Sequence, residues 1–397
     1  MQNAVASKPL SALSPELKFL VACCQAEPAH ADVDFITFFL ETTPTAHHEL
    51  IGLAGLHGVV PQVYKMLKRL SEEKRITVGK ELYAAFKAAY MQTARSNMLM
   101  SAELLRIMKL LEHNGIEALG FKGPALAQLA YGDITLRQFG DLDILVAKAD
   151  ALQAISLLES DGYVPEIMLS GSKKEAFFVS VNVLGLSHPS HGVRIEVHWG
   201  LLSKNYAVSW DMRKLLSRPG QVLINGSAIA VPPQTDHLLY LCIHGSKHLY
   251  ERLEWITDVD RTVRMSLPDW EELLDAAGEK GVTRMVLLSL WLCRELFALP
   301  LPETVHAEMD RDKTVEALGQ RIITTQFGRE ATSSRSYGTF WLLWQMRERF
   351  VDRFRFTFYG LLLPKFDDFR YLALPKQLLF LYPLIRLFRL TMKYIKK

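Results

Sequence analysis

Two aspartates, Asp141 and Asp143, stand before and within the start of residues 142–146, whose other members are apolar as in a buried β-strand. In a strand, residues i and i+2 point to the same face and lie about 7 Å apart. Two carboxylates this close repel one another, and a divalent cation would relieve the repulsion. Carboxylate oxygens suit Mg²⁺ and Mn²⁺, which also bind substrate phosphates. The pair therefore predicts a metal site on an exposed strand face, and solvated aspartates at a strand edge are the alternative.

A third carboxylate lies on a later predicted strand. Residues 193–199 alternate in polarity, so Glu196 and His198 share the face opposite the apolar side chains. Glu196 could complete a two-metal site by ligating one ion and helping to deprotonate an attacking hydroxyl. His198 could orient that hydroxyl or bind substrate. For His198 the alternative is a half-buried ring packed beside Trp199.

A Lys-Gly turn, Lys122-Gly123, follows a short apolar segment and precedes a predicted helix. Glycine permits close approach of the backbone, a helix N-terminus attracts anions, and lysine supplies a positive charge. We interpret the turn as a small phosphate-binding site that lacks the further glycines and the Ser/Thr of a Walker A loop. Arg137, four residues before Asp141, could clamp a polyphosphate, and a surface salt bridge is the alternative for it.

The elements that must position these side chains divide the chain into three parts. The length of 397 residues is enough for two or three domains. Residues 1–98 show helical apolar spacing, residues 99–232 contain the short strands and helices of an α/β core, and residues 233–397 are helical again. We therefore expect an α+β fold in which a mixed sheet is flanked by N-terminal and C-terminal helical domains.

Local signals within these parts predict individual elements. A long helical pattern covers residues 80–113 and stops at Asn114-Gly115, as a helix C-terminus should. Residues 116–121 read as a short strand, and residues 173–186 as one strand or two. Asn225-Gly226 predicts the type I′ turn of a β-hairpin.

Two histidines, His244 and His248, are four residues apart and therefore share one face of a predicted helix. A zinc pair is the less favoured reading, because the segment lacks the glutamate of an HExxH motif and no third ligand is evident. We expect His244, Lys247 and His248 to face the cleft between the core and the C-terminal helices, where they would contact nucleotide or acceptor. Asp258 could pair with one histidine. A helix surface packed on the core is the alternative.

The charge of the chain is uneven. The whole sequence has a formal net charge of +3, whereas residues 341–397 carry twelve Lys/Arg and four Asp/Glu, a net charge of +8. Residues 378–395 combine leucines with basic residues, which fits either a helix lying on a membrane surface or a helix–helix core. Nucleic acid is not excluded as an acceptor, although the sequence shows no recognised nucleic-acid-binding module.

The cysteines indicate a reducing compartment. Cys23, Cys24, Cys242 and Cys293 all lie in apolar helical contexts, and no CxxC pair occurs. Because adjacent cysteines rarely form a bridge, we expect reduced thiols and a cytoplasmic protein. No apolar run reaches the roughly 18 residues of a membrane-spanning helix. Any membrane contact would therefore be peripheral.

Taken in order, these motifs resemble a known family. The segment LGFKGPALAQLAYGDITLRQFGDLDILV, the later IEVHWGL and the helix IHGSKHLYERLEWITDVDR are similar to the uncharacterised nucleotidyltransferase-like proteins of the DNA polymerase β superfamily. The turn Lys122-Gly123 replaces the usual Gly-Ser turn of that superfamily, and Glu196 stands where aspartate is common. The matching positions are Lys122, Gly123, Tyr131, Arg137, Asp141, Asp143, Glu196, His198 and Trp199.

The resemblance implies a polymerase β-like core and Mg²⁺-dependent (or Mn²⁺-dependent) transfer of a nucleoside monophosphate from a nucleoside triphosphate to an acceptor hydroxyl, with release of pyrophosphate. It leaves the acceptor unnamed. A non-catalytic nucleotide-binding or scaffold protein of a biosynthetic system is one alternative, and a toxin-like transferase acting on RNA or protein is another. The expected catalytic and metal-binding residues are Asp141, Asp143 and Glu196. The expected nucleotide-binding residues are Lys122, Gly123, Arg137, His198, His244, Lys247 and His248.

Overall fold

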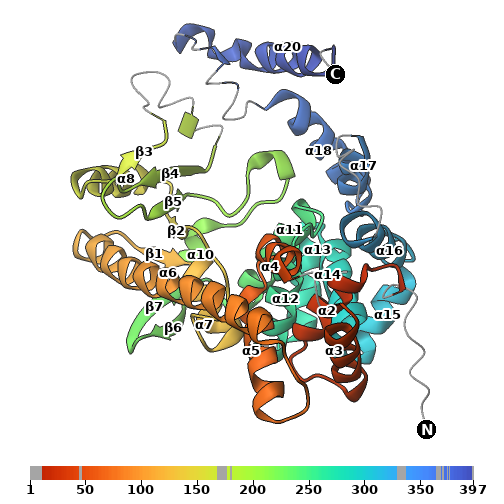
Figure 1. The fold of residues 1–397 in the computed structure, drawn as a ribbon. Helices are drawn as coiled ribbons and strands as arrows, with labels where there is room; N and C mark the ends of the chain where they lie inside the picture. The colour runs from red at the N-terminus through yellow and green to blue at the C-terminus, as the bar shows by residue number, and fades with distance from the viewer. Residues whose placement is uncertain are drawn as a thin grey trace.

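The chain folds into a five-stranded mixed sheet set against a larger body of α-helices (Figure 1). The α+β class expected from the sequence is confirmed. The computed structural model describes residues 11–43, 47–167, 177–178, 181–328, 337–363, 368, 371–372, 374 and 376–395.

The N-terminal part is helical, as expected. Its helices are α2 (Pro15–Cys23), α3 (His30–Thr42), α4 (His47–Leu56), α5 (Val60–Glu72) and α6 (Lys80–His113). Helix α6 ends at the predicted Asn114-Gly115, where Gly115 takes a φ of +71° that glycine adopts without strain. It has 34 residues and crosses the expected boundary at residue 98 without a break. The N-terminal helices and the core are therefore joined by one rigid element.

The five strands lie in the spatial order β1-β2-β5-β4-β3. Strands β2 and β5 are parallel, whereas the other neighbours are antiparallel, and Asp143 of β2 stands in register with Glu196 of β5. The order of the chain therefore brings two distant carboxylates together at the centre of the sheet. The strands are β1 (Ala118–Gly120), β2 (Leu142–Val146), β3 (Val164–Pro165), β4 (Val183–Ser187) and β5 (Arg194–His198), and two helices connect them, α7 (Gly123–Tyr131) and α8 (Ala151–Ser160).

One strand prediction was partly wrong, and one strand was missed. The strand expected over residues 173–186 is β4 from Val183 onward, whereas residues 177–178 are helical and 173–176 lie outside the described residues. Strand β3 was missed because it has two residues, one of them proline. The predicted hairpin is confirmed: β6 (Gly220–Ile224) and β7 (Ser227–Val231) flank Asn225 and Gly226, both with positive φ.

The two faces of the sheet have different coverings. Leu142 and Ile144 of β2 face a core that they share with apolar side chains of α6 and α8. Leu145, two residues beyond Asp143, belongs instead to the core of the helical body. The carboxylate-bearing face of β2 therefore looks toward the helical body, and α6 and α8 support the sheet from behind.

The two helical flanks share one hydrophobic core. The Arg261 guanidinium donates to the Cys24 carbonyl at 2.7 Å, and the Gln25 amide donates to the Leu296 carbonyl at 2.9 Å. After the sheet come η1 (Lys204–Tyr206), α10 (Met212–Leu216), α11 (Gln234–Lys247), α12 (Leu253–Ser266), α13 (Trp270–Lys280), α14 (Thr283–Phe297), α15 (Glu303–Arg311), α16 (Thr314–Phe327), α17 (Tyr337–Gln345), α18 (Phe350–Leu362), η2 (Lys376–Leu381) and α20 (Tyr382–Ile395). Among the described residues no helix is long and apolar enough to span a membrane.

Gly245 in α11 offers a test of this packing. A Cβ at Gly245 would overlap the ring of Tyr250, which is fully buried. We expect Gly245→Ala to lower the free energy of unfolding by about 1–3 kcal/mol because the ring has no room to move, as measured by urea denaturation.

The matched control is Gly52→Ala in α4. Gly52 is exposed, and an added Cβ would meet nothing within 4 Å. In this variant the free energy of unfolding should rise by about 0.5–1 kcal/mol, because alanine favours a helix more than glycine does. Equal effects at the two positions would show that Tyr250 does not constrain α11 in this way.

Candidate metal and nucleotide site

Asp143, Glu196 and His198 form a compact cluster on the central strands. His198 Nε2 lies 3.1 Å from Asp143 Oδ1 and 3.2 Å from Glu196 Oε2. One ligand atom from each residue lies within 4.8 Å of the others, which is close enough for one metal ion. Asp143 is only 3% exposed, so the expectation of an exposed face was wrong for this residue. Its carboxylate is buried because Lys122 and His198 pack over it.

Lys122 provides a positive charge beside Asp143. Its Nζ lies 3.2 Å from Asp143 Oδ1 and sits over the rings of Phe121 and Tyr240, 5.5 and 5.6 Å from their centroids. Burial alone would lower the pKa of Lys122, but Asp143 and Tyr240 raise that pKa above its usual value. Lys122 is therefore an ammonium ion at neutral pH, aimed at the carboxylates.

The charges of the cluster stabilise one another. Burial by itself would raise the pKa of Asp143, but Lys122 and His198 bring that pKa below its usual range. Burial likewise opposes the ionisation of Glu196, and the hydrogen bond from His198 lowers the pKa of Glu196 overall. For His198, the two carboxylates outweigh burial and raise the pKa. Both carboxylates are thus held in the ionised form that a cation requires.

Asp141 stands beside this cluster and is not part of it. Its Oδ2 lies 2.9 Å from Nη1 of Arg194, whose Nη2 lies 2.8 Å from Glu196 Oε1. Burial and the neighbouring carboxylates Asp143 and Glu196 raise the pKa of Asp141. Arg194 therefore bridges two of the three carboxylates expected to bind metal. Arg194 was not predicted as a site residue, although its position two residues before Glu196 places both side chains on one strand face.

The Lys-Gly turn leads directly into helix α7. Gly123 opens α7 with a φ of +53°, and a Cβ at this position would lie 3.2 Å from the Asp141 carbonyl oxygen. Lys122 is the N-cap residue and makes no side-chain capping hydrogen bond. The first N–H groups of a helix have no partner within the helix, so they can bind an anion. Glycine is needed here for its conformation and for the close approach.

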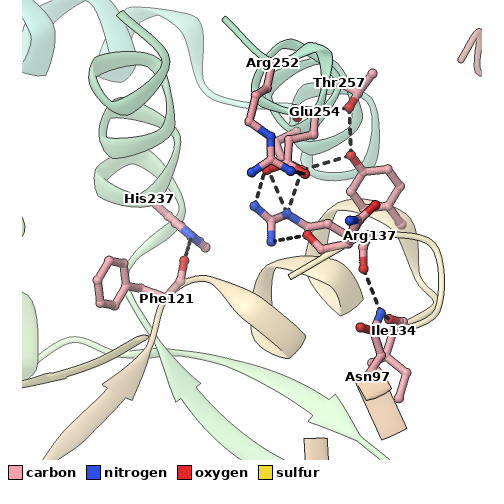
Figure 2. Close-up of polar contacts among 11 residues, drawn as sticks. Asn97, Phe121, Ile134, Arg137, His237, Arg252, Glu254 and Thr257 are labelled. Carbon is pink, nitrogen blue, oxygen red and sulfur yellow. Dashed lines mark hydrogen bonds and ion pairs between the residues drawn. The ribbon is translucent and has the colours of Figure 1, made fainter. Parts of the chain in front are cut away.

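Arg137 is not placed as a phosphate clamp. Its Nε and Nη2 donate to the two carboxylate oxygens of Asp258 at 2.9 and 3.0 Å, and Arg137 is only 6% exposed. Tyr131 donates to the same carboxylate at 2.9 Å. The suggestion that Asp258 pairs with a histidine was also wrong. Figure 2 shows Arg137 pointing toward α12, so the pair ties the loop after α7 to the helical body.

Asn97 of α6 holds the same loop from the other side. Its side-chain amide donates to the carbonyls of Ile134 and Arg137, both at 2.7 Å (Figure 2). Asn97 is fully buried. The segment that leads to Asp141 is thus fixed between α6 and α12.

Helix α11 presents a row of ring side chains near Lys122. Tyr240, His244 and His248 are spaced by four residues, and neighbouring rings lie 5.7 and 4.9 Å apart. Burial and the charge of Lys122 lower the pKa of His244, and burial with Lys247 lowers the pKa of His248 to about 4. Both imidazoles are therefore neutral at neutral pH. In the described chain neither belongs to a group of three metal-ligating side chains.

Lys247 and His237 lie on the same face of α11, and each contacts a neighbouring element of the fold. Lys247 Nζ lies 5.2 Å from the centroid of the Tyr206 ring in η1. His237 was not predicted as a site residue, and its Nε2 lies 2.6 Å from the Phe121 carbonyl oxygen (Figure 2). That contact anchors α11 to the end of β1, one residue before Lys122. The sequence could have indicated this residue, because a spacing of seven places His237 on the same helix face as His244.

The sequence matches the family described as uncharacterised nucleotidyltransferases over residues 43–298. The chain belongs to this nucleotidyltransferase family. A comparison with curated proteins found no match. An antigenic nucleotidyltransferase-like protein from Paracoccidioides brasiliensis, solved by crystallography, is similar over 60% of this chain and 95% of its own, with 13% identity and a TM-score of 0.31. Because that score is low, the family assignment rests on the sequence match.

The Arg137–Asp258 pair leads to a prediction about stability. Arg137→Met leaves Asp258 as a buried carboxylate without its cation, so we expect the free energy of unfolding to fall by about 3–5 kcal/mol. Arg218→Met, at an exposed arginine, is the control and should change little. A variant of Arg137 that keeps its stability in urea but loses nucleotide affinity would instead favour the polyphosphate clamp.

A second prediction concerns pH. Burial lowers the pKa of His237 to about 4, below its value of about 6.5 in an unfolded chain. The unfolded state therefore binds the proton more tightly, and stability is lost as pH falls from about 6.5 to 4. We expect the titration of His237 to lower the free energy of unfolding by about 2 kcal/mol as pH falls from 7 to 5. His237→Gln keeps an N–H donor for the Phe121 carbonyl and does not titrate. The free energy of unfolding of this variant, measured by urea denaturation, should therefore change less between pH 7 and 5 than that of the wild type. An equal change in both proteins would show that His237 does not cause the pH dependence.

Proposed function

We propose that this protein transfers a nucleoside monophosphate from a nucleoside triphosphate to an acceptor hydroxyl, releases pyrophosphate, and requires Mg²⁺ or Mn²⁺. The observation that carries the proposal is the arrangement of Asp143, Glu196 and His198 around a common point, with Lys122 and the start of α7 alongside. Membership of the nucleotidyltransferase family supports the reaction class.

The donor set fits a divalent cation. The two carboxylates suit Mn²⁺ and also Mg²⁺, which keeps several waters and binds substrate phosphates. Asp143 and Glu196 are paired in register on adjacent strands, so the backbone fixes their separation. Asp141 would join them by leaving Arg194, and we propose it as the third carboxylate. A cation bound here would neutralise charge on the phosphates and make the attacking hydroxyl more acidic.

The protein's own groups would seat the triphosphate. Lys122 would exchange part of its contact with Asp143 for a phosphate oxygen, and the backbone N–H of Gly123 would approach the same anion. The neutral rings of His244 and His248 lie on the helix next to Lys122. We propose that they and Lys247 border the nucleotide or the acceptor. Arg137 would act by positioning the loop.

In the proposed step, the acceptor oxygen forms a bond to the α-phosphorus while the bond from that phosphorus to the bridging oxygen breaks. Pyrophosphate leaves with the bridging oxygen. The hydroxyl proton passes to Glu196, which is ionised and hydrogen-bonded to His198. His198 orients Glu196 and Asp143 from a buried position between them.

We also propose a cytoplasmic location, where nucleoside triphosphates are abundant. It is supported by the four cysteines, which are free thiols and buried. The non-catalytic binding protein and the toxin-like transferase remain alternatives. A protein that binds nucleotide without releasing pyrophosphate would be of the first kind, and growth arrest that depends on Asp143 would indicate the second.

The proposal predicts the behaviour of Asp143→Asn. With nucleoside triphosphates labelled at the α-phosphorus and a cell extract supplying small molecules, RNA and protein, the wild type should label one acceptor class and release pyrophosphate. Asp143→Asn should lose about a hundredfold or more of this rate, because an oxygen ligand of the metal is lost.

The matched control is Asp275→Asn, an exposed carboxylate on α13, which should keep the rate. Circular dichroism of both variants would show whether they fold. Full activity of a folded Asp143→Asn variant would overturn the proposed mechanism.

A further inference from the structure

The C-terminal helices leave an unusual amount of apolar surface uncovered. Of the 25 bulky apolar side chains that are exposed in the described chain, fifteen lie between residues 340 and 392, so they are concentrated in one region. Figure 1 shows α17 and α18 leading away from the helical body and α20 lying beyond β3 and β4. This region lies outside residues 43–298, which carry the family match.

On α18 the exposed side chains share one face. Phe350, Phe354 and Phe358 are spaced by four residues and are 75%, 64% and 47% exposed. The opposite face holds Asp352 and Phe356, which are buried. Helix α18 therefore uses one face for the fold and presents a second, aromatic face to the outside.

Helix α20 repeats this arrangement. Leu384 and Phe388 are 61% and 55% exposed, whereas Tyr382 and Arg386 are buried. The Arg386 guanidinium donates to the Gly360 carbonyl of α18 at 3.1 Å and pairs with Asp368. The two helices are thus fixed to one another, and we call them the C-terminal arm.

The charge of the arm indicates which kind of partner it can bind. Within residues 349–363 the sole acidic residue is Asp352, which is buried, and residues 376–395 contain none. The Arg355 side chain is 57% exposed, and its Nη1 lies 3.8 Å from Asp352 Oδ1. The arm thus combines exposed aromatic and aliphatic groups with an excess of cations over carboxylates, in the segment of net charge +8. This is the complement of an anionic lipid surface.

We propose that the C-terminal arm docks the protein on the surface of an anionic membrane. The exposed rings of α18 and α20 would enter the headgroup region while arginines and lysines meet lipid phosphates. A second copy fits less well, because it would set two surfaces of strong positive charge against each other. The docking does not depend on the proposed nucleotidyl transfer.

The arm also touches the surroundings of the candidate site. Phe356 of α18 lies 6.3 Å from the Tyr206 ring, and Lys247 of α11 stands over that same ring. A membrane-bound arm would therefore hold α11, and the site beside it, close to the lipid surface.

Vesicle flotation of the full chain tests the docking. Vesicles of phosphatidylcholine alone would be compared with vesicles in which about a third of the lipid is phosphatidylglycerol. The wild type should float with the anionic vesicles, less so as salt is raised. The double variant Phe354→Ser/Phe358→Ser should lower the partition coefficient about tenfold or more, and Arg355→Glu should weaken the preference for anionic lipid.

The control is Phe38→Ser/Leu223→Ser, which removes two apolar side chains of similar exposure, 60% and 62%, outside the arm. It should float like the wild type. The proposal is overturned if the wild type does not float, or if the arm and control variants float alike. It is also overturned if light scattering shows a dimer that the arm variant dissociates while vesicles bind neither protein, since the occupant would then be a second copy.

Discussion

A buried carboxylate with a second carboxylate beside it is the constraint around which this molecule is arranged. Asp143 is almost fully buried and stands in register with Glu196 on the neighbouring strand. Two such charges are costly in a protein interior unless cations and hydrogen-bond donors surround them. Lys122 and His198 supply those groups for Asp143, and Arg194 supplies them for Glu196. A metal ion bound to a triphosphate would serve the same electrostatic purpose with a different set of contacts.

The helical body is part of this arrangement. His237 fixes α11 against the end of β1, directly before Lys122. The buried Arg137–Asp258 pair fixes the loop before Asp141 against α12. Both contacts join residues that are more than 115 positions apart in the chain. The sheet contributes the carboxylates, and the helices determine where the lysine and the rings stand relative to them.

The parts of the site that depend on local periodicity could be predicted from the sequence. Alternation along a strand is enough to place Glu196 and His198 on one face, and Lys122-Gly123 could be recognised because glycine and a following helix are local signals. Arg137 could not be interpreted in this way. Its partner Asp258 lies 121 residues away, and nothing in the local pattern distinguishes a buried arginine from one that binds phosphate. The shared core of the two helical flanks could not be predicted from the sequence either, because it depends on tertiary packing between distant segments.

The most direct test is to locate the metal. Crystals grown with Mn²⁺ and a triphosphate analogue that cannot be cleaved at the α-phosphorus would show the ion by its anomalous scattering. We expect one peak about 2 Å from carboxylate oxygens of Asp143 and Glu196, with Lys122 turned toward the phosphates. A bound analogue with no ion at these carboxylates, or with the ion at His244 and His248, would contradict this expectation.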